Sequence, residues 1–301
     1  MKLVYLILAH KDPEHLARLI TRLTTSNSSF VVHIDKKSDI SKFRQLTPKN
    51  VVFTEKRVPV YYDYSIIEAT LIMLKQALSL SVSFDYFIRL AGVDYPIQPT
   101  GYIEKFFEIN NGKEFIELLP RYEGDIEFPL RRIERFYFRE NSSRYEKFFY
   151  KILSRTNLSK DRLTEFYKFG LKQYWGNALW ALSQRACEYV LDFSRKNKRV
   201  LNYFKHTHAP EEMLFQIILG NSSFYNNIFD GLHYIDWSNK QRHPPELTEN
   251  HLDYFSKSLK VSKGDIECLF ANKFSSRNKS VVDKLDLIIE DKERQYHGNY
   301  G

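Results

Sequence analysis

Hydrophobic and polar positions in the first hundred residues alternate between two periods. Short β-branched apolar runs predict strands over residues 3–8, 30–34, 51–53 and 85–90. Between them, apolar residues recur at helical spacing after Asp12-Pro13 and again over 65–80. Such an alternation of strands and helices is typical of an α/β domain with a parallel sheet.

Polar residues mark the ends of these predicted elements. Asp12 before Pro13 has the form of a helix N-cap, and Ser65 can cap the second helix. His10, Asp35 and Asp94 follow strands. Because ligands of open α/β sheets bind outside the carboxyl ends of the strands, these three residues are candidates for a ligand site.

The second half of the chain is less regular. Residues 121–172 are dense in Arg, Glu, Phe and Tyr without a clean period, and we expect loops and helices that line a groove. Further along, the pattern predicts a strand over 178–183, a helix from Gln184 and another helix over 210–219. The chain has no repeat and no Pro/Gly/Ser linker, which favours a single domain over residues 1–301.

Composition narrows the class of partner. The 45 Lys and Arg residues exceed the 37 Asp and Glu residues, so the formal charge is +8 and favours nucleotides, phosphate groups or an acidic membrane surface. The cations are not interleaved with aromatic residues in a compact pattern, so we expect no nucleic-acid partner. The apolar run at 3–9 is far shorter than the roughly 20 residues of a membrane-spanning helix and lacks a cleavage site, so we expect only peripheral membrane contact.

The two cysteines, Cys187 and Cys268, are far apart and lack metal-ligand spacing. Neither a disulfide framework nor a thiolate metal site is expected, and a reducing cytosol suits the chain.

The sequence His-Thr-His-Ala-Pro-Glu-Glu at 206–212 is the strongest local candidate for a catalytic motif. Glu211 and Glu212 follow Pro210 in a first helical turn, where acidic residues also stabilise the helix dipole without any function. His206 and His208 are alternate residues with only nearby carboxylates, which is a weak signal for a metal, so we assign no metal ligands.

Two cations near the C-terminus are candidates for binding an anion. Arg242 alone has the form of a surface charge, whereas Lys273 lies between the apolar residues Phe270 and Phe274. A cation among buried neighbours usually has an anionic partner, and a diphosphate is suitable. The chain has no Gly-rich dinucleotide fingerprint, no Walker loop and no paired Asp-x-Asp motif for a metal.

Seven segments, in order, resemble the core-2/I-branching β-1,6-N-acetylglucosaminyltransferase family, which also contains the peptide O-xylosyltransferases. They are YLILAHK from Tyr5, VHIDKKS from Val32, SIIEA from Ser65, FIRLAGVDYPI from Phe87, YWGN from Tyr174, APEE from Ala209 and LFANKF from Leu269. They span nearly the whole chain, and the absence of a membrane anchor and of clustered cysteines resembles a bacterial-type member of the family.

This resemblance implies a fold and a reaction. The fold is a GT-A-like, Rossmann-type α/β domain with a mixed, mainly parallel sheet, in which residues 1–100 bind the nucleotide and 101–301 supply the acceptor and catalytic half. The reaction is transfer from a UDP-sugar with inversion and without a metal or other cofactor. Glu212 takes the place of the general base, and Arg242 and Lys273 replace the metal at the diphosphate. An inverting transfer needs such a base and positive charge on the leaving group.

The resemblance also assigns the remaining donor residues. His10 and Asp35 match positions that contact uridine, and Asp94 matches a position beside the donor sugar. Ser65 belongs to the same donor group of motifs.

On the acceptor side, Trp175 and Trp237 suit stacking on a sugar ring and Glu117 suits hydrogen bonding to acceptor hydroxyls, with core packing as the alternative for the tryptophans. Arg131, Arg132 and Arg135 either grip an acidic acceptor or cover a helix face with charge.

The chain departs from the family pattern in two segments near the donor site. Residues 61–65 read YYDYS where related bacterial sequences often read WGGYS, and residues 90–94 read LAGVD where they often read LSGQD. N-acetylglucosamine is therefore the first expectation for the donor sugar, with xylose, another hexose or an inactive UDP- or carbohydrate-binding protein as alternatives. The expected acceptor is a cell-surface glycan, lipid-linked at the inner face of the membrane, for a cytoplasmic enzyme.

Overall fold

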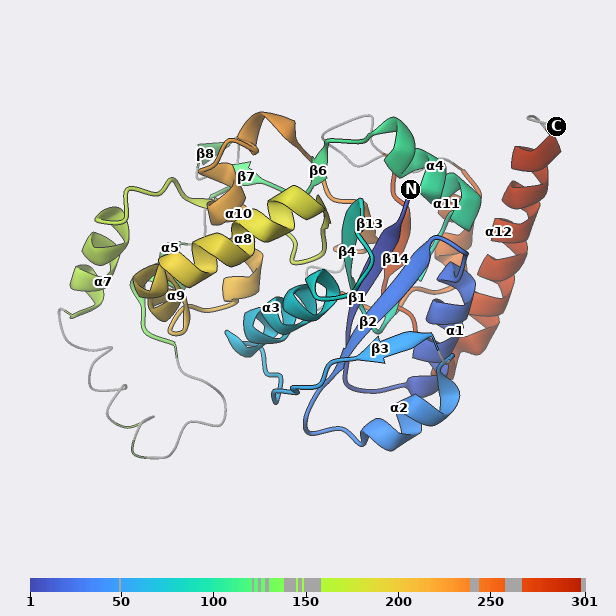
Figure 1. Ribbon diagram of the computed structural model, residues 1–301, viewed down its shortest axis with the longest axis horizontal. Helices are drawn as coiled ribbons and strands as arrows, with labels where there is room; N and C mark the ends of the chain where they lie inside the picture. The colour runs from blue at the N-terminus through green and yellow to red at the C-terminus, as the bar shows by residue number, and fades with distance from the viewer. Residues whose placement is uncertain are drawn as a thin grey trace.

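The computed structural model describes residues 1–48, 50–120, 122–123, 126–127, 130–137, 145, 148, 158–238, 244–257 and 267–298. Its centre is a seven-stranded sheet with the order β12-β6-β11-β4-β1-β2-β3 (Figure 1). The strands are β1 (Leu3–Ala9), β2 (Ser28–Ile34), β3 (Val51–Phe53), β4 (Tyr86–Ala91), β6 (Glu114–Phe115), β11 (Ala181–Ser183) and β12 (Ile228–Phe229). All neighbours in this sheet pair in parallel except β11, which is antiparallel to both β4 and β6. The mixed, mainly parallel α/β sheet expected of a GT-A-like fold is therefore confirmed.

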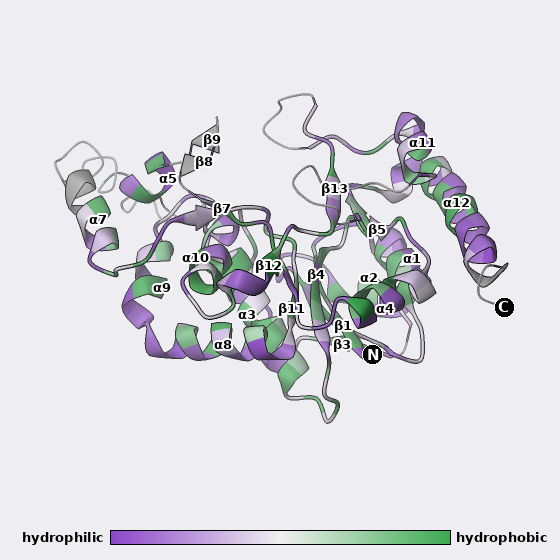
Figure 2. Ribbon diagram, turned by 90° about the horizontal axis from the view of Figure 1, so that it is seen from above, coloured by the Kyte–Doolittle hydropathy of each residue, from purple (hydrophilic) through white to green (hydrophobic). Residues whose placement is uncertain are grey.

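Helices cover both faces of the sheet. One face carries α1 (Pro13–Leu23), α4 (Thr100–Ile109) and α12 (Lys279–Gly298), and the other carries α3 (Ser65–Leu78), α8 (Gln184–Lys196), α9 (Lys198–Phe204) and α10 (Leu214–Gly220). Figure 2 shows this division from above. The central strand β1 explains it, because Tyr5 and Ile7 are buried in the first core and Val4 and Leu6 in the second. Strands buried on both faces have continuous apolar sequences, which is why they could be predicted.

A second, three-stranded sheet lies beside the carboxyl ends of the main strands. It consists of β13 (His233–Ile235), β14 (Phe270–Asn272) and β5 (Asp94–Pro96), with β14 parallel to β13 and antiparallel to β5. The remaining elements are α2 (Ile40–Leu46), α5 (Leu130–Glu134), α7 (Leu158–Tyr167), α11 (Leu252–Phe255), β7 (Leu119–Pro120), β8 (Tyr122–Glu123), β9 (Ile126–Glu127), β10 (Tyr174–Trp175) and the 3₁₀ turns η1 (Pro210–Glu212), η2 (Tyr225–Asn227), η3 (Glu249–His251) and η4 (Ser276–Asn278). In the described part of the chain, no helix combines the length and the apolar character needed to cross a bilayer.

The first helix begins as its sequence predicts. Asp12 is the N-cap of α1, and its Oδ1 accepts a hydrogen bond from the backbone N–H of His15 at 3.1 Å. Its second carboxyl oxygen accepts from the N–H of Ser276 at 2.7 Å, so the cap also joins α1 to the C-terminal part of the chain.

Two expectations about helix boundaries are wrong. Ser65 does not cap α3 but is its first residue, because Asp63 accepts the backbone N–H of Ser65 at 2.8 Å. The helix predicted over 210–219 is two elements, η1 and α10, because Met213 leaves helical backbone angles (φ −135°) and is fully buried. Packing of Met213 interrupts the helix at a position where the apolar period alone continues it.

Candidate functional site

The carboxyl ends of β1, β2 and β4 meet at one edge of the main sheet. The N–H of Asp35 donates to the carbonyl of Ala9 at 2.8 Å, and the N–H of Gly92 donates to the carbonyl of Leu8 at 2.8 Å. A Cβ on Gly92 would lie 2.6 Å from the Cβ of Ala9, so this approach requires glycine. The strand-end residues predicted from sequence therefore do gather along one edge.

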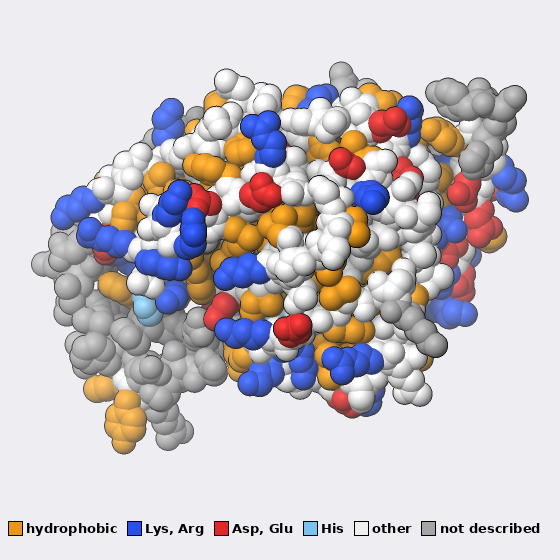
Figure 3. Space-filling model, viewed as in Figure 1, with side chains coloured by type: hydrophobic (Ala, Val, Ile, Leu, Met, Phe, Trp, Pro, Cys, Tyr) orange, Lys and Arg blue, Asp and Glu red, His pale blue; other side chains and the backbone are white. Residues whose placement is uncertain are grey.

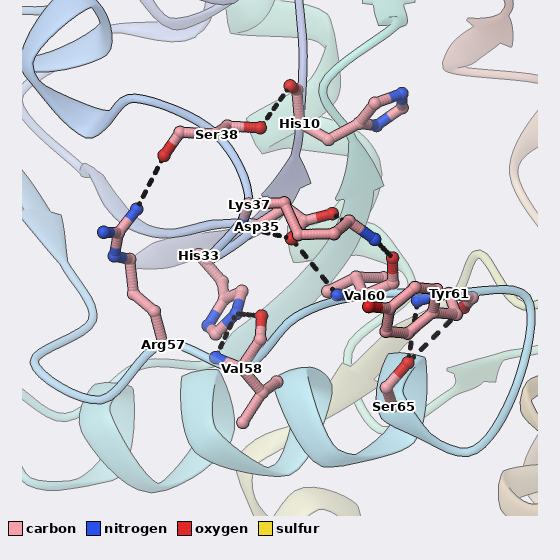
Figure 4. Close-up of polar contacts among 10 residues, drawn as sticks. All are labelled: His10, His33, Asp35, Lys37, Ser38, Arg57, Val58, Val60, Tyr61 and Ser65. Carbon is pink, nitrogen blue, oxygen red and sulfur yellow. Dashed lines mark hydrogen bonds and ion pairs between the residues drawn. The ribbon is translucent and has the colours of Figure 1, made fainter. Parts of the chain in front are cut away.

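Asp35 is the centre of a polar network at this edge (Figure 4). Its buried carboxylate accepts from the backbone N–H groups of Lys37 at 2.9 Å and Val60 at 3.2 Å, and the ammonium of Lys37 lies 3.2 Å from its other oxygen. That ammonium also lies 3.6 Å from the centre of the Tyr61 ring. The network holds the segment before α3 against the end of β2, and leaves Lys37 and Tyr61 at the rim.

His10 and Ser65 occupy different positions in the same network. His10 is exposed, and its carbonyl accepts from the hydroxyl of Ser38 at 2.6 Å. Partial desolvation, aided by the charge of Lys11, lowers the pKa of the His10 imidazole, which favours its neutral form. Ser65 is buried, and its Oγ accepts a hydrogen bond from the N–H of Tyr61 at 2.8 Å, so it stabilises the segment that precedes α3.

Asp94 is buried more deeply than we expect for a residue that contacts a ligand. It is fully buried, and its two oxygens accept hydrogen bonds from the N–H of Ala91 at 2.7 Å and the side-chain amide of Asn272 at 2.6 Å. His233 Nε2 lies 3.4 Å from the oxygen that accepts from Ala91. In this structure Asp94 braces the β4–β5 turn against β13 and β14, and its contact with a donor sugar stays a prediction.

Lys273 follows β14 directly and lies beside the same turn. Leu247 N–H donates to its carbonyl at 2.9 Å, and the N–H of the next residue, Phe274, donates to the carbonyl of Val93 at 2.7 Å. Within the described part of the chain, the partly buried ammonium of Lys273 makes no hydrogen bond or ion pair. It is thus available to an anion at this edge. Arg242, its expected partner, lies outside the described residues.

Glu212 ends η1 and keeps about a third of its side-chain surface exposed, with an exposed fraction of 34%. The turn is entered through Ala209, which has left-handed backbone angles (φ 46°). One carboxylate oxygen of Glu212 forms an ion pair with the guanidinium of Arg132 on α5. The structure thus brings one of the three arginines at 131–135 to the candidate base.

The helix α5 that carries Arg132 is fixed firmly. The buried Arg162 donates to the carbonyls of Ile133 at 2.9 Å and Tyr203 at 2.8 Å, and the N–H of His208 donates to the carbonyl of Arg132 at 3.2 Å. Because α5 is tied to α7, α9 and the 206–208 segment, Arg132 approaches Glu212 from a rigid support.

The segment 175–177 joins Glu212 to Glu117. The N–H of Gly176 donates to the carbonyl of Glu212 at 2.9 Å, and the next N–H, of Asn177, donates to the carboxylate of Glu117 at 2.7 Å. Gln216 on α10 donates to the carbonyl of Asn177 at 2.8 Å. Neighbouring peptide groups therefore hold the backbone of the predicted base, Glu212, and the carboxylate of the predicted acceptor residue, Glu117.

The two tryptophans differ in exposure. Trp175 packs against the second core, and its indole Nε1 is buried without a hydrogen bond in the described part of the chain. Trp237 follows β13 and is 55% exposed, so only its ring offers an open face for stacking.

Sequence reasoning missed the environment of Glu211, which precedes the candidate base. Burial raises the pKa of Glu211 to about 8, with further contributions from the charges of Glu212 and Asp63, and against the opposing effect of a hydrogen bond from its own backbone N–H and of the charge of Arg132. Its Oε2 atom and the Oδ2 atom of Asp63 are buried, and neither has a hydrogen-bond partner among the described residues. Two consecutive acidic residues after a proline give no signal as to which of them has an enclosed carboxyl oxygen.

The described residues contain no group of three or more His, Cys, Asp or Glu side chains placed to hold a metal ion. His206 and His208 instead contact aromatic rings, those of Phe136 and Tyr137.

The known proteins that this chain resembles include β-1,6-N-acetylglucosaminyltransferases. A β-1,3-galactosyl-O-glycosyl-glycoprotein β-1,6-N-acetylglucosaminyltransferase 3 of Bos taurus is 24% identical over 220 residues, which cover 71% of this chain and 46% of that protein. A β-1,3-galactosyl-O-glycosyl-glycoprotein β-1,6-N-acetylglucosaminyltransferase of Bovine herpesvirus 4 is 26% identical over 223 residues, with the same shares of the two chains. The chain spans about half the length of the curated relatives that it matches.

Solved structures match more weakly. Mouse xyloside xylosyltransferase 1 has a TM-score of 0.34 and 10% identity, covering 92% of this chain and 99% of that one. A 4-diphosphocytidyl-2C-methyl-D-erythritol synthase of Anaerococcus prevotii has a TM-score of 0.37 and 11% identity, covering 84% and 94%. Neither likeness is close enough to bear on function.

A family model also matches the sequence. The sequence model described as "Branch: Core-2/I-Branching enzyme" matches residues 3–258, which is most of the 301-residue chain and includes β1, β2, β4 and η1. The chain belongs to the Core-2/I-branching enzyme family.

Proposed function

We propose that this protein is an inverting glycosyltransferase that moves a sugar, first of all N-acetylglucosamine, from a UDP-sugar to a glycan hydroxyl. The observation that carries the proposal is the arrangement of Glu212, a partly exposed carboxylate fixed through its own carbonyl and through Arg132. Its family membership and the names of its relatives agree with this class of reaction.

Glu212 acts as the general base in this proposal. An inverting displacement needs one group that removes the proton of the attacking hydroxyl while that hydroxyl approaches the anomeric carbon. Glu117 accepts a hydrogen bond from Asn177, the residue after the one that binds the carbonyl of Glu212. In this proposal Glu117 orients the acceptor by hydrogen bonding to the hydroxyl groups of the acceptor sugar. The exposed ring of Trp237 provides a stacking surface for an acceptor sugar.

Lys273 and Arg242 stabilise the departing diphosphate, so the reaction needs no metal. The support for this is the ammonium of Lys273, which is partly buried and unpaired within the described part of the chain. Fixed cations aimed at a developing negative charge lower the barrier without reorganisation. Asp35, Lys37 and Tyr61 surround the place where the nucleoside binds, at the carboxyl ends of the strands.

The acceptor in this proposal is a growing cell-surface glycan carried by a lipid at the inner face of the membrane, reached from the cytoplasm by peripheral contact. Lys and Arg side chains gather over α9 and the end of α8 (Figure 3). Arg195 and Lys196 there share a single acidic partner, Asp192, so the surface keeps an excess of positive charge. Each cation near an anionic membrane contributes about 1 kcal/mol. Sedimentation with anionic and with neutral vesicles tests this part, and equal binding to both contradicts it.

The main experiment is calorimetric titration with UDP and a panel of UDP-sugars, in EDTA and then with manganese. Tight UDP binding in EDTA agrees with the proposal, and the sugar that binds best and is transferred identifies the donor. A preference for UDP-xylose or another UDP-hexose changes the donor but keeps the reaction. Binding only with manganese contradicts the metal-free mechanism, and binding of UDP-sugars without any transfer contradicts catalysis.

A further inference from the structure

The two acidic residues of η1 lie in different environments although they are neighbours in the chain. Glu212 is partly exposed and paired with Arg132. Glu211 has a carboxyl oxygen, Oε2, that is buried and has no hydrogen-bond donor among the described residues. The carboxyl group receives a hydrogen bond from its own backbone N–H, but a charged carboxylate with one buried oxygen left without a donor is still costly, and the protonated form avoids most of that cost.

A second acidic group faces the same place from another element. Asp63, which is 7% exposed, precedes α3, and its Oδ1 accepts from the N–H of Ser65 at 2.8 Å. Its Oδ2 is buried and, within the described part of the chain, unpartnered, like the Oε2 of Glu211. The negative charges of the two groups repel each other, and a proton on Glu211 removes that repulsion.

Cations face the pair from two further elements. Arg89 on β4 is fully desolvated, which lowers its pKa to about 10, and it hydrogen-bonds Thr70 and a backbone carbonyl, with no ion pair to a carboxylate in the described residues. Arg132 on α5 interacts with Glu211 electrostatically but forms its ion pair with Glu212. The charge of Arg132 thus acts on two adjacent carboxyl groups. Which of them Arg132 pairs with depends on which is charged.

We propose that Glu211 is a positioning residue that stays protonated in the folded protein and thereby reserves Arg132 for Glu212. While Glu211 is neutral, Glu212 is the only charged carboxylate of η1, and Arg132 fixes its orientation. When Glu211 loses its proton, a second negative charge repels Glu212 and competes for Arg132. The orientation of Glu212 is then lost. This inference rests on the proposed role of Glu212, but the protonation itself does not.

The direction of the pH effect follows from the raised pKa of Glu211. The folded protein binds this proton more tightly than the unfolded chain does, because the pKa is about 8 in the fold and 4.5 ordinarily. The stability contributed by the proton is complete below pH about 4.5 and is lost as the pH rises through about 8. Glutamine at position 211 keeps the size and neutrality of the protonated acid at every pH.

The first experiment measures protonation without using activity. Urea midpoints of the full-length wild type, Glu211→Gln and the control Glu188→Gln are compared from pH 5 to about pH 9. Glu188 is exposed on α8, where it accepts a hydrogen bond from the side-chain amide of Gln184. We expect the wild type and the control to lose stability relative to Glu211→Gln as the pH rises. Parallel curves for all three proteins overturn the proposal.

The second experiment measures positioning through the rate of sugar transfer against pH. We expect wild-type transfer to decline above pH about 8, and Glu211→Gln to keep its rate within about threefold at pH 7 and to lack that decline. Glu211→Ala, which leaves a cavity, should transfer slowly at every pH. An unchanged alkaline decline in Glu211→Gln overturns the positioning role. If the wild type transfers no sugar, the proposed function fails, while the urea midpoints still decide the protonation.

Discussion

Gly176 and Glu117 are in closer contact than any side chain at position 176 permits. A Cβ on Gly176 would lie 2.2 Å from the carbonyl oxygen of Glu117 and 2.8 Å from its carbonyl carbon. The same peptide segment donates to the carbonyl of Glu212 and to the carboxylate of Glu117. This single close approach therefore helps to set the position of Glu117 relative to the backbone of Glu212, the two residues on which the proposed reaction depends.

Gly176→Ala should lower both stability and sugar transfer. The added methyl group meets backbone atoms that cannot move away, so we expect a loss of about 1–3 kcal/mol in unfolding free energy. Transfer should fall further than stability explains, since the contacts to Glu117 and Glu212 shift together. The matched control is Gly101→Ala in α4, where no atom lies within 4 Å of the new Cβ and alanine favours the helix. Equal behaviour of the two variants in urea unfolding contradicts the close contact.

Glu212→Gln should abolish most transfer while donor binding persists. Loss of a general base costs about 10²–10⁴-fold in rate, and the base acts on the acceptor and not on the nucleotide. Rates under saturating donor, together with calorimetric UDP affinity, separate the two effects. Glu188→Gln on the surface of α8 is the control. A transfer rate near that of the wild type rules out Glu212 as the base.

Lys273→Ala should weaken UDP binding. The ammonium is partly buried, and its charge has no partner in the described part of the chain, so an anion that meets it gains a charge-assisted contact of about 1.5–3 kcal/mol. Calorimetry of UDP and of uridine distinguishes a diphosphate contact, because uridine binding should not change. Lys279→Ala, an exposed residue of α12, provides the comparison. An unchanged UDP affinity removes Lys273 from the diphosphate site.

Asp94→Asn tests whether Asp94 acts as a brace. Both carboxyl oxygens accept from N–H donors, and an asparagine replaces one of them with an NH₂ group that faces a donor. One buried mismatch of this kind should cost about 1–3 kcal/mol in unfolding free energy. Asp253→Asn, on the exposed face of α11, should leave urea unfolding unchanged. A variant of Asp94 with wild-type stability and reduced donor binding would instead assign Asp94 to the donor sugar.

The fold was predictable where the sequence and the packing agree. Buried parallel strands such as β1 are apolar on both faces, and the Asp12 cap uses a local hydrogen bond, so both could be predicted from the sequence alone. The break at Met213 could not be predicted from sequence, because it depends on the packing of the Met213 side chain in a core formed by distant elements.

The candidate site divides in the same way. His10 and Asp35 do lie along one edge, as expected from the ends of their strands. The burial of Asp94 and of the Oε2 atom of Glu211 is a tertiary property, since their surroundings come from residues far away in sequence such as Asn272 and Asp63. Their chemical roles therefore needed the three-dimensional structure.

The antiparallel strand β11 has a consequence for how the chain assembles. It lies between β4, from the first hundred residues, and β6, from the later part, and pairs with both. A fragment that ended at residue 100 would expose the edge of β4 and would leave β5 without its partner β14. Exposed strand edges promote aggregation. The first hundred residues and the later part of the chain are thus interleaved, and we expect them to be inseparable as independently folding pieces.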